Sequence, residues 1–275
     1  MSDDHAYPAL AEGHEDDARW AYGTGFEDPL HGVDSALSDG VDAGELAADC
    51  VALADDALVL AQRLAEWTTR APELEEEVAL ANIGLDLLGQ ARLLYSRAGQ
   101  ADGTGRDEDA YAYFRDADDF RNVRLAELPG GDFAFSVARL LVLSAWRLAH
   151  FERLTASGDP VLAAIAAKGV KELTYHRQYA AEWVVRLGDG TAESRRRMRD
   201  AWEQVAPYVD ELFTVYDVRD AVGGVLRQVT EAAGIPLPVC RPLPGTGRDG
   251  EHTKHLAPLL TELQSVARAH PEAAW

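Results

Sequence analysis

Cysteine, lysine and long apolar runs are all scarce in this sequence, and each shortage excludes a class of protein. Two cysteines, Cys50 and Cys240, cannot form a disulfide framework or a Cys-x-x-Cys metal site. No apolar run reaches the roughly 18 residues that a membrane span requires. The first residues, MSDDHAYPALAEGHEDD, lack the basic start and the apolar core of a secretory signal. We therefore expect a soluble, cytoplasmic protein with no membrane partner.

Positive charge is scarce as well. The 275 residues include 26 Lys and Arg against 47 Asp and Glu, which gives a net charge of −21. Because a surface of this sign repels phosphate backbones, we expect no nucleic-acid partner.

Only three residues, Lys168, Lys171 and Lys254, are lysines. An acidic surface poor in lysine is typical of proteins from a high-salt cytoplasm, where salt screens the repulsion between carboxylates. A GC-rich genome, which favours Arg, Ala, Asp and Gly, is the alternative explanation.

The acidic residues are concentrated at the N-terminus. Residues 1–49 hold 13 acidic residues and one basic residue, Arg19. Gly, Pro, Asp and His are scattered through this stretch without a helical or a strand period. We therefore predict a flexible acidic extension over 1–44 and a single folded domain over 45–275.

The rest of the chain has apolar residues at helical spacing and no alternating segment that would predict a strand. Tight turns rich in Pro and Gly separate four long predicted helices, over about 45–67, 73–98, 132–156 and 160–187. Shorter helices are predicted near 107–127, after Thr191 with a break at Pro207, and over 217–233 and 253–269. This pattern predicts an all-α fold, in which two antiparallel hairpins form a four-helix bundle with additional C-terminal helices.

Bundles of this kind often hold two metal ions between a Glu from each of two helices and a Glu-x-x-His from each of the other two. Positions i and i+3 share one helix face, so that carboxylate and imidazole reach one metal. No Glu-x-x-His occurs here, and the two Asp-x-x-His pairs lie in stretches rich in Gly and Pro. Distances from the hairpin turns place the four carboxylate positions at Asp56, Asp86, Ser144 and Glu172, with Gly89 and Tyr175 in the histidine slots. Such a degenerate site predicts that this chain binds no metal.

The remaining carboxylates require a cation, because a buried unpaired carboxylate is unfavourable. Lys168 lies four residues before Glu172 on the same helix face. We hypothesise that Lys168 replaces the metal charge, pairing with Glu172 and with Asp86 or Asp56; the alternative is an exposed lysine. His176 is one residue away from the required slot, and we expect it to be buried and hydrogen-bonded. The predicted structural polar cluster is Asp56, Asp86, Gln90, Lys168, Glu172 and His176.

Other candidate motifs are weaker. Ser144, His150 and His176 form no nucleophile motif, so no catalytic residue is predicted. The run Arg195–Arg197 has the charge to bind a coenzyme A phosphate, but a solvated helix face is the favoured interpretation. His252 and His255 offer only two metal ligands beside a loop.

Four stretches resemble the PaaA/PaaC family, the ferritin-like subunits of bacterial phenylacetyl-CoA epoxidase. They are LAQRLAEW (60–67), APELEEEVALANIGLDLLGQAR (71–92), AAIAAKGVKELTYH (163–176) and HTKHLAPLLTELQ (252–264). The resemblance spans about 50–275 and implies a ferritin-like bundle. It implies that PaaA-type chains carry the di-iron site and epoxidise the ring of phenylacetyl-CoA, whereas PaaC-type chains are metal-free structural partners. A reductase and small accessory subunits complete such a complex. Ser144 departs from the pattern, since a carboxylate is expected there in a relative with more ligands.

Three functions therefore remain to be compared. The first is a non-catalytic subunit that supports a di-iron partner in aerobic phenylacetate catabolism, and it predicts a large exposed apolar surface on the isolated chain. The second is an autonomous metal-dependent oxygenase of the ferritin-like superfamily, which needs about six ligands where about three are present. The third is an acyl-CoA binding module, which needs a basic pocket that the net charge disfavours.

Overall fold

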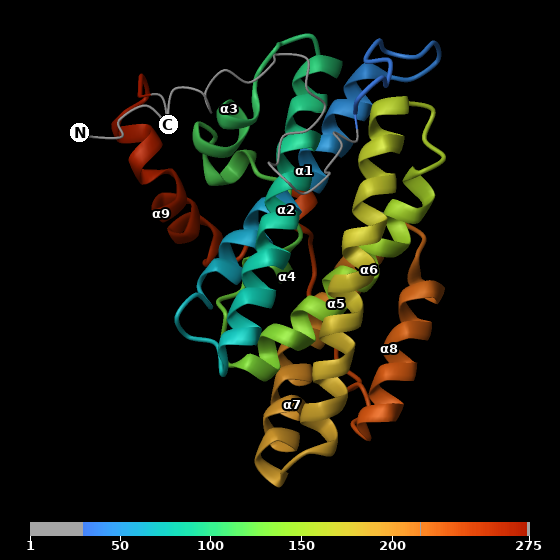
Figure 1. Ribbon diagram of the computed structural model, residues 1–275, viewed down its shortest axis with the longest axis vertical. Coiled ribbons are helices and arrows are strands. Elements are labelled where there is room, and N and C mark those ends of the chain that lie inside the picture. The colour runs from blue at the N-terminus through green and yellow to red at the C-terminus, as the bar shows by residue number, and fades with distance from the viewer. Residues whose placement is uncertain (1–29, 215, 274–275) are drawn as a thin grey trace, which may run out of the picture.

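The computed structural model describes residues 30–214 and 216–273, and every regular element in those ranges is a helix (Figure 1). The four long helices are α1 (Ala43–Ala65), α2 (Leu74–Ala101), α5 (Phe133–Leu154) and α6 (Pro160–Asp189). They agree with the four predicted long helices to within a few residues. The all-α prediction is confirmed.

An aspartate caps the start of three of the four long helices. The side chains of Asp42, Asp132 and Asp159 each accept a hydrogen bond from a backbone N–H in the first turn of α1, α5 and α6. An aspartate in this position satisfies a donor that the helix itself leaves unpaired. Pro160 follows as the first residue of α6, where its missing N–H costs nothing. The Asp-Pro start that the sequence predicts for this helix is present.

Shorter helices fill the connections and the C-terminal part. Between the two hairpins lie α3 (Glu108–Tyr113), the 3₁₀ turn η2 (Ala117–Asp119) and α4 (Arg124–Glu127). After α6 come α7 (Ala192–Val205), η3 (Ala206–Tyr208), η4 (Asp210–Phe213), α8 (Arg219–Ala233), η5 (Gly247–Asp249) and α9 (Leu256–Ala269). The predicted break at Pro207 is present, because α7 ends at Val205 and the chain continues in 3₁₀ turns.

The long helices form two antiparallel hairpins. Helix α1 packs along α2, α5 packs along α6, and the hairpins meet where α2 contacts α6. Helices α7 and α8 cover the α5/α6 hairpin, whereas α9 lies against α3 on the other side of the molecule (Figure 1). The result is a four-helix bundle with additional C-terminal helices.

Helix α5 is the one described helix whose length and composition would suit a membrane span, and it lies inside this bundle. Its buried side chains run along nearly its whole length, from Ala134 to Phe151. Because other elements cover α5 on all sides, the helix has no solvent-facing stripe that would require polar residues. This burial accounts for its apolar composition.

The segment before α1 differs from the predicted extension. Leu30, Val33 and Val41 pack against the core, and the Ser35 carbonyl accepts a hydrogen bond from Arg97 Nη1 at 2.8 Å. The part of the predicted extension over residues 30–44 is therefore held against the domain, and α1 begins at Ala43. The expectation for residues 1–29 lies outside the described residues.

Candidate functional site

The centre of the bundle contains a buried carboxylate, Asp56 on α1, that is held by two guanidinium groups. Arg248, from η5, donates to Asp56 through Nη1 at 3.0 Å and through Nη2 at 2.6 Å. The backbone N–H of Val123 donates to the same carboxylate at 2.8 Å. Arg147 Nη1 on α5 lies 3.7 Å from Asp56 Oδ2. Asp56 therefore meets guanidinium groups from α5 and from the loop before α9.

Arg147 connects this carboxylate to α2. Its Nη1 donates to the Leu53 carbonyl at 3.0 Å, and its Nη2 donates to Gln90 Oε1 at 2.9 Å. The side chain is almost fully buried. Burial lowers the pKa of Arg147 to about 10, and the nearby Asp56 charge opposes that shift. The guanidinium is therefore still charged at neutral pH.

Gln90 continues the connection to α6. Its Nε2 donates to Glu172 Oε2 at 2.9 Å, and Glu172 is in turn paired with Lys168 one turn earlier on the same helix. One polar chain thus links α1, α5, α2 and α6 through the sequence Asp56, Arg147, Gln90, Glu172 and Lys168. A network in which each charge meets a partner avoids the free-energy penalty of an isolated buried charge.

A second contact joins α2 and α6 beside this chain. His176 Nε2 lies 3.0 Å from Asp86 Oδ2. His176 is buried, as expected, whereas 37% of the Asp86 side chain is exposed. The contacts of Asp86 with His176 and of Gln90 with Glu172 run in opposite chain directions, so α2 and α6 are antiparallel at this height.

The remaining predicted positions supply no metal ligand set. Ser144 is buried, and its hydroxyl donates to the Leu141 carbonyl of its own helix at 3.3 Å. A Cβ atom at Gly89 would meet nothing within 4 Å, and Tyr175 is half exposed, so the two predicted histidine slots face outward instead of into the bundle, and Ser144 supplies only a hydroxyl.

These residues do not fit a di-iron centre. Iron sites in such bundles use carboxylate and neutral imidazole ligands, but Arg147 and Arg248 place positive charge directly beside Asp56. In the described part of the chain, no three His, Cys, Asp or Glu residues are grouped closely enough to hold a metal ion. No step that depends on a metal can be assigned to these side chains.

The predicted pair of Lys168 with Glu172 is present, but the cations beside Asp56 are other residues. They are Arg248 and Arg147, neither of which is a predicted member of the polar cluster. Arg248 is 192 residues from Asp56 in the sequence. A search for pairs at helical spacing could not have found this contact. Arg147 could have been noticed as a charged residue in the apolar stretch of α5.

The weaker motifs have structural partners. Arg196 and Arg197 both donate to Glu193 on the exposed side of α7, and Arg196 also pairs with Asp200. His252 contacts Glu127 Oε1 through Nδ1 at 2.7 Å and the Phe120 carbonyl through Nε2 at 2.9 Å. Both ring nitrogens of His252 therefore face protein acceptors, and neither is directed at a metal site.

Comparison with known proteins identifies the family of this chain. The sequence model of the phenylacetic acid catabolic proteins matches residues 38–275. The chain belongs to this family. One of the subunits of the 1,2-phenylacetyl-CoA epoxidase of Escherichia coli (strain K12) is 42% identical over 247 residues, covering 84% of this chain and 99% of that relative. The predicted resemblance is confirmed, and the match begins before α1, within the segment that packs against the domain. As a member of the phenylacetic acid catabolic family, this protein acts in phenylacetate catabolism.

Proposed function

We propose that this chain is a non-catalytic structural subunit of a cytoplasmic monooxygenase that epoxidises the ring of phenylacetyl-CoA. In this proposal a PaaA-type partner holds the di-iron site, and a reductase and small accessory subunits complete the complex. The named relative is itself a subunit of such an epoxidase. The observation that carries the proposal is the pairing of Asp56 with Arg248 and Arg147 at the position where a metal would need anionic ligands.

The internal polar chain suits a supporting role. Replacing the charge of a metal by fixed guanidinium groups lets the bundle fold with its central carboxylates compensated. Side chains from four helices then set the spacing between the two hairpins without a cofactor.

The alternative functions have less support. An autonomous oxygenase would need ligands in place of Ser144, Gly89 and Tyr175. An acyl-CoA module would need free cations, but Arg196 and Arg197 are engaged with Glu193.

Iron content and activity test the proposal together. The chain should be purified alone and with the catalytic subunit of the same epoxidase, each exposed to ferrous iron under conditions that load a di-iron protein. We expect no stoichiometric iron on the isolated chain, and phenylacetyl-CoA-dependent oxygen uptake only when the catalytic subunit is present. A full iron load on the isolated chain, with the absorption bands of a di-iron centre, would overturn the proposal.

A further inference from the structure

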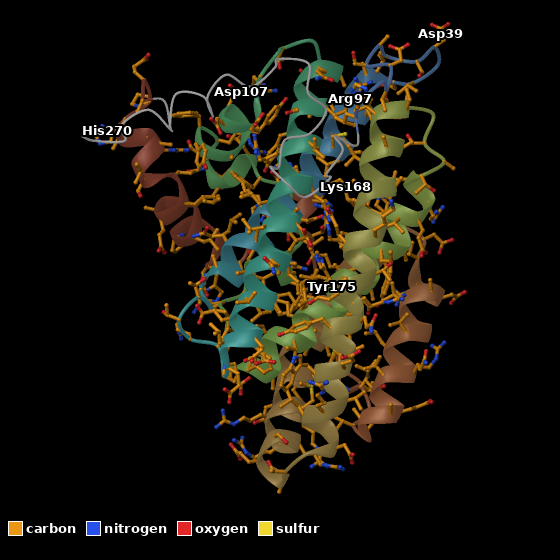
Figure 2. All side chains as sticks on the ribbon, viewed as in Figure 1. Asp39, Arg97, Asp107, Lys168, Tyr175 and His270 are labelled. Atoms are coloured by element: carbon orange, nitrogen blue, oxygen red, sulfur yellow. The ribbon has the colours of Figure 1, made fainter. Side chains whose placement is uncertain are left out.

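Helix α2 carries large apolar side chains on its solvent side. Leu74, Val78, Leu85 and Leu88 are exposed, with 70% of Leu74 and 64% of Leu85 accessible. Tyr175 of α6 is half exposed, and Figure 2 places it on the side of the molecule where α2 and α6 lie at the front. We name these five residues and Gly89 the α2–α6 face. A row of exposed apolar side chains on one helix is a candidate interaction surface.

The spacing of the stripe indicates what would cover it. Leu74, Val78, Ala81, Leu85 and Leu88 follow one another at intervals of four, three, four and three residues. This alternation is the heptad spacing by which one α-helix packs along another. Different residues of α2 pack in the core of this chain, among them Leu80, Ile83 and Leu87. Helix α2 therefore has a second apolar side that its own bundle does not use.

Gly89 supports a close intermolecular contact. It lies one turn after Leu85 in the interior of α2, where glycine destabilises a helix relative to alanine. A Cβ atom at Gly89 would meet nothing within 4 Å. In contrast, a Cβ at Gly169 of α6 would lie 2.6 Å from the Phe151 ring, so packing explains that glycine. No packing within the described chain explains Gly89, but the close approach of a partner helix would.

The face lies directly over the polar chain of the bundle. The contacts of Asp86 with His176 and of Gln90 with Glu172 join α2 and α6 at the height of Gly89 and Tyr175. Because the Asp86 side chain is still partly exposed, a helix seated on this face would also cover the Asp86–His176 pair.

We propose that the α2–α6 face is the docking surface for a helix of the catalytic subunit; this inference rests on the proposed function. The N-terminal end of the stripe is bordered by Glu73, Glu75, Glu76 and Glu77. The docking helix should therefore carry an apolar heptad stripe with Arg or Lys beside the Leu74 end. A second copy of this chain fits less well, because each copy has a net charge of −21.

Two substitutions with different effects on folding test the surface. Gly89→Ala should leave the isolated chain as stable as the wild type or more stable, since alanine favours the helix and meets no neighbour. It should nevertheless weaken binding to the catalytic subunit by about tenfold or more, because the new methyl group prevents close approach. Leu85→Gln should weaken binding similarly without lowering the melting temperature. Val266→Gln, at an exposed position of α9 outside the face, is the matched control and should change neither.

Melting temperatures of the isolated variants and calorimetric titration with the purified catalytic subunit supply the measurements. Wild-type affinity of both Gly89→Ala and Leu85→Gln would overturn this surface while leaving the proposed function intact. A wild-type chain that does not bind the catalytic subunit would overturn the proposed function and the surface with it. Self-association of the wild type that Leu85→Gln abolishes would assign the face to a second copy and also overturn the proposal.

Discussion

At the scale of single residues, the two cations of the polar chain differ in burial. Arg147 is almost fully buried, whereas 22% of the Lys168 side chain is exposed. Removing a buried partner leaves an uncompensated charge or unpaired acceptors, while a partly exposed pair is screened by water. Because Asp56 keeps its pair with Arg248, the main loss in Arg147→Met is the hydrogen bond to the buried Gln90 Oε1, and we predict that the free energy of unfolding falls by about 1–3 kcal/mol. Lys168→Met should lower it by about 1 kcal/mol or less. Urea denaturation of both variants decides the point, and equal losses would contradict the ranking.

A second residue-scale prediction concerns the protonation of His252. Burial opposes its charge, but the hydrogen bond and the charge of Glu127 raise its pKa above the ordinary value, and Arg121 acts weakly against them. Both ring nitrogens face acceptors, Glu127 Oε1 and the Phe120 carbonyl, which suits an imidazolium. Because the pKa in the folded state is raised, this stabilisation is complete below the unfolded pKa of about 6.5. It is lost as the pH rises through the folded pKa.

The measurement compares the free energy of unfolding of the wild type with that of the His252→Gln variant. The stability of the wild type relative to His252→Gln should be greatest below about pH 6.5 and should decline at higher pH. Burial lowers the pKa of His150 to about 3, so His150 changes stability with pH in the opposite direction. Both proteins retain His150, and its contribution therefore cancels when the two stabilities are subtracted. Denaturant unfolding from pH 5.5 to 9 would measure it. A difference independent of pH would show that folding leaves the pKa of His252 unchanged, and a difference that grows with pH would show that folding lowers it.

At the scale of helices, one aspartate both caps α6 and pairs across the bundle. Asp159 accepts a hydrogen bond from the Leu162 N–H and forms a buried ion pair with Arg97 of α2. Asp132 caps α5 in the same way, but 39% of its side chain is exposed. Asparagine caps a helix as well as aspartate does but carries no charge. We predict that Asp159→Asn destabilises the protein by about 3 kcal/mol, whereas Asp132→Asn changes stability by less than about 1 kcal/mol. Thermal or urea unfolding of the two variants provides the comparison, and a similar effect of both would show that the Arg97 pair contributes little.

Local patterns were sufficient to predict the helices but not most of the polar contacts between them. The Asp159–Pro160 start and the break at Pro207 are consequences of nearby chemistry, and both could be located from the sequence. The pair of Lys168 and Glu172 follows from helical spacing in the same way. Arg248 reaches Asp56 only because η5 is placed against α1 by the whole fold. Single-sequence spacing holds no information about such a contact, so the true partners of Asp56 had to come from the structure.

At the scale of the whole molecule, the excess of 21 negative charges should make stability depend on salt. Arginine pairs such as Arg97–Asp159 and Arg115–Asp55 are buried, and salt screens them little. Repulsion among surface carboxylates is screened, since the Debye length falls from about 10 Å at 0.1 M salt to about 3 Å at 1 M. We therefore predict that the melting temperature at pH 7.5 rises between about 0.1 and about 2 M KCl. The rise should shrink near the isoelectric point of about 4.7, where the net charge vanishes. A melting temperature that is flat or falls with KCl at pH 7.5 would mean that surface repulsion does not limit the stability of this bundle.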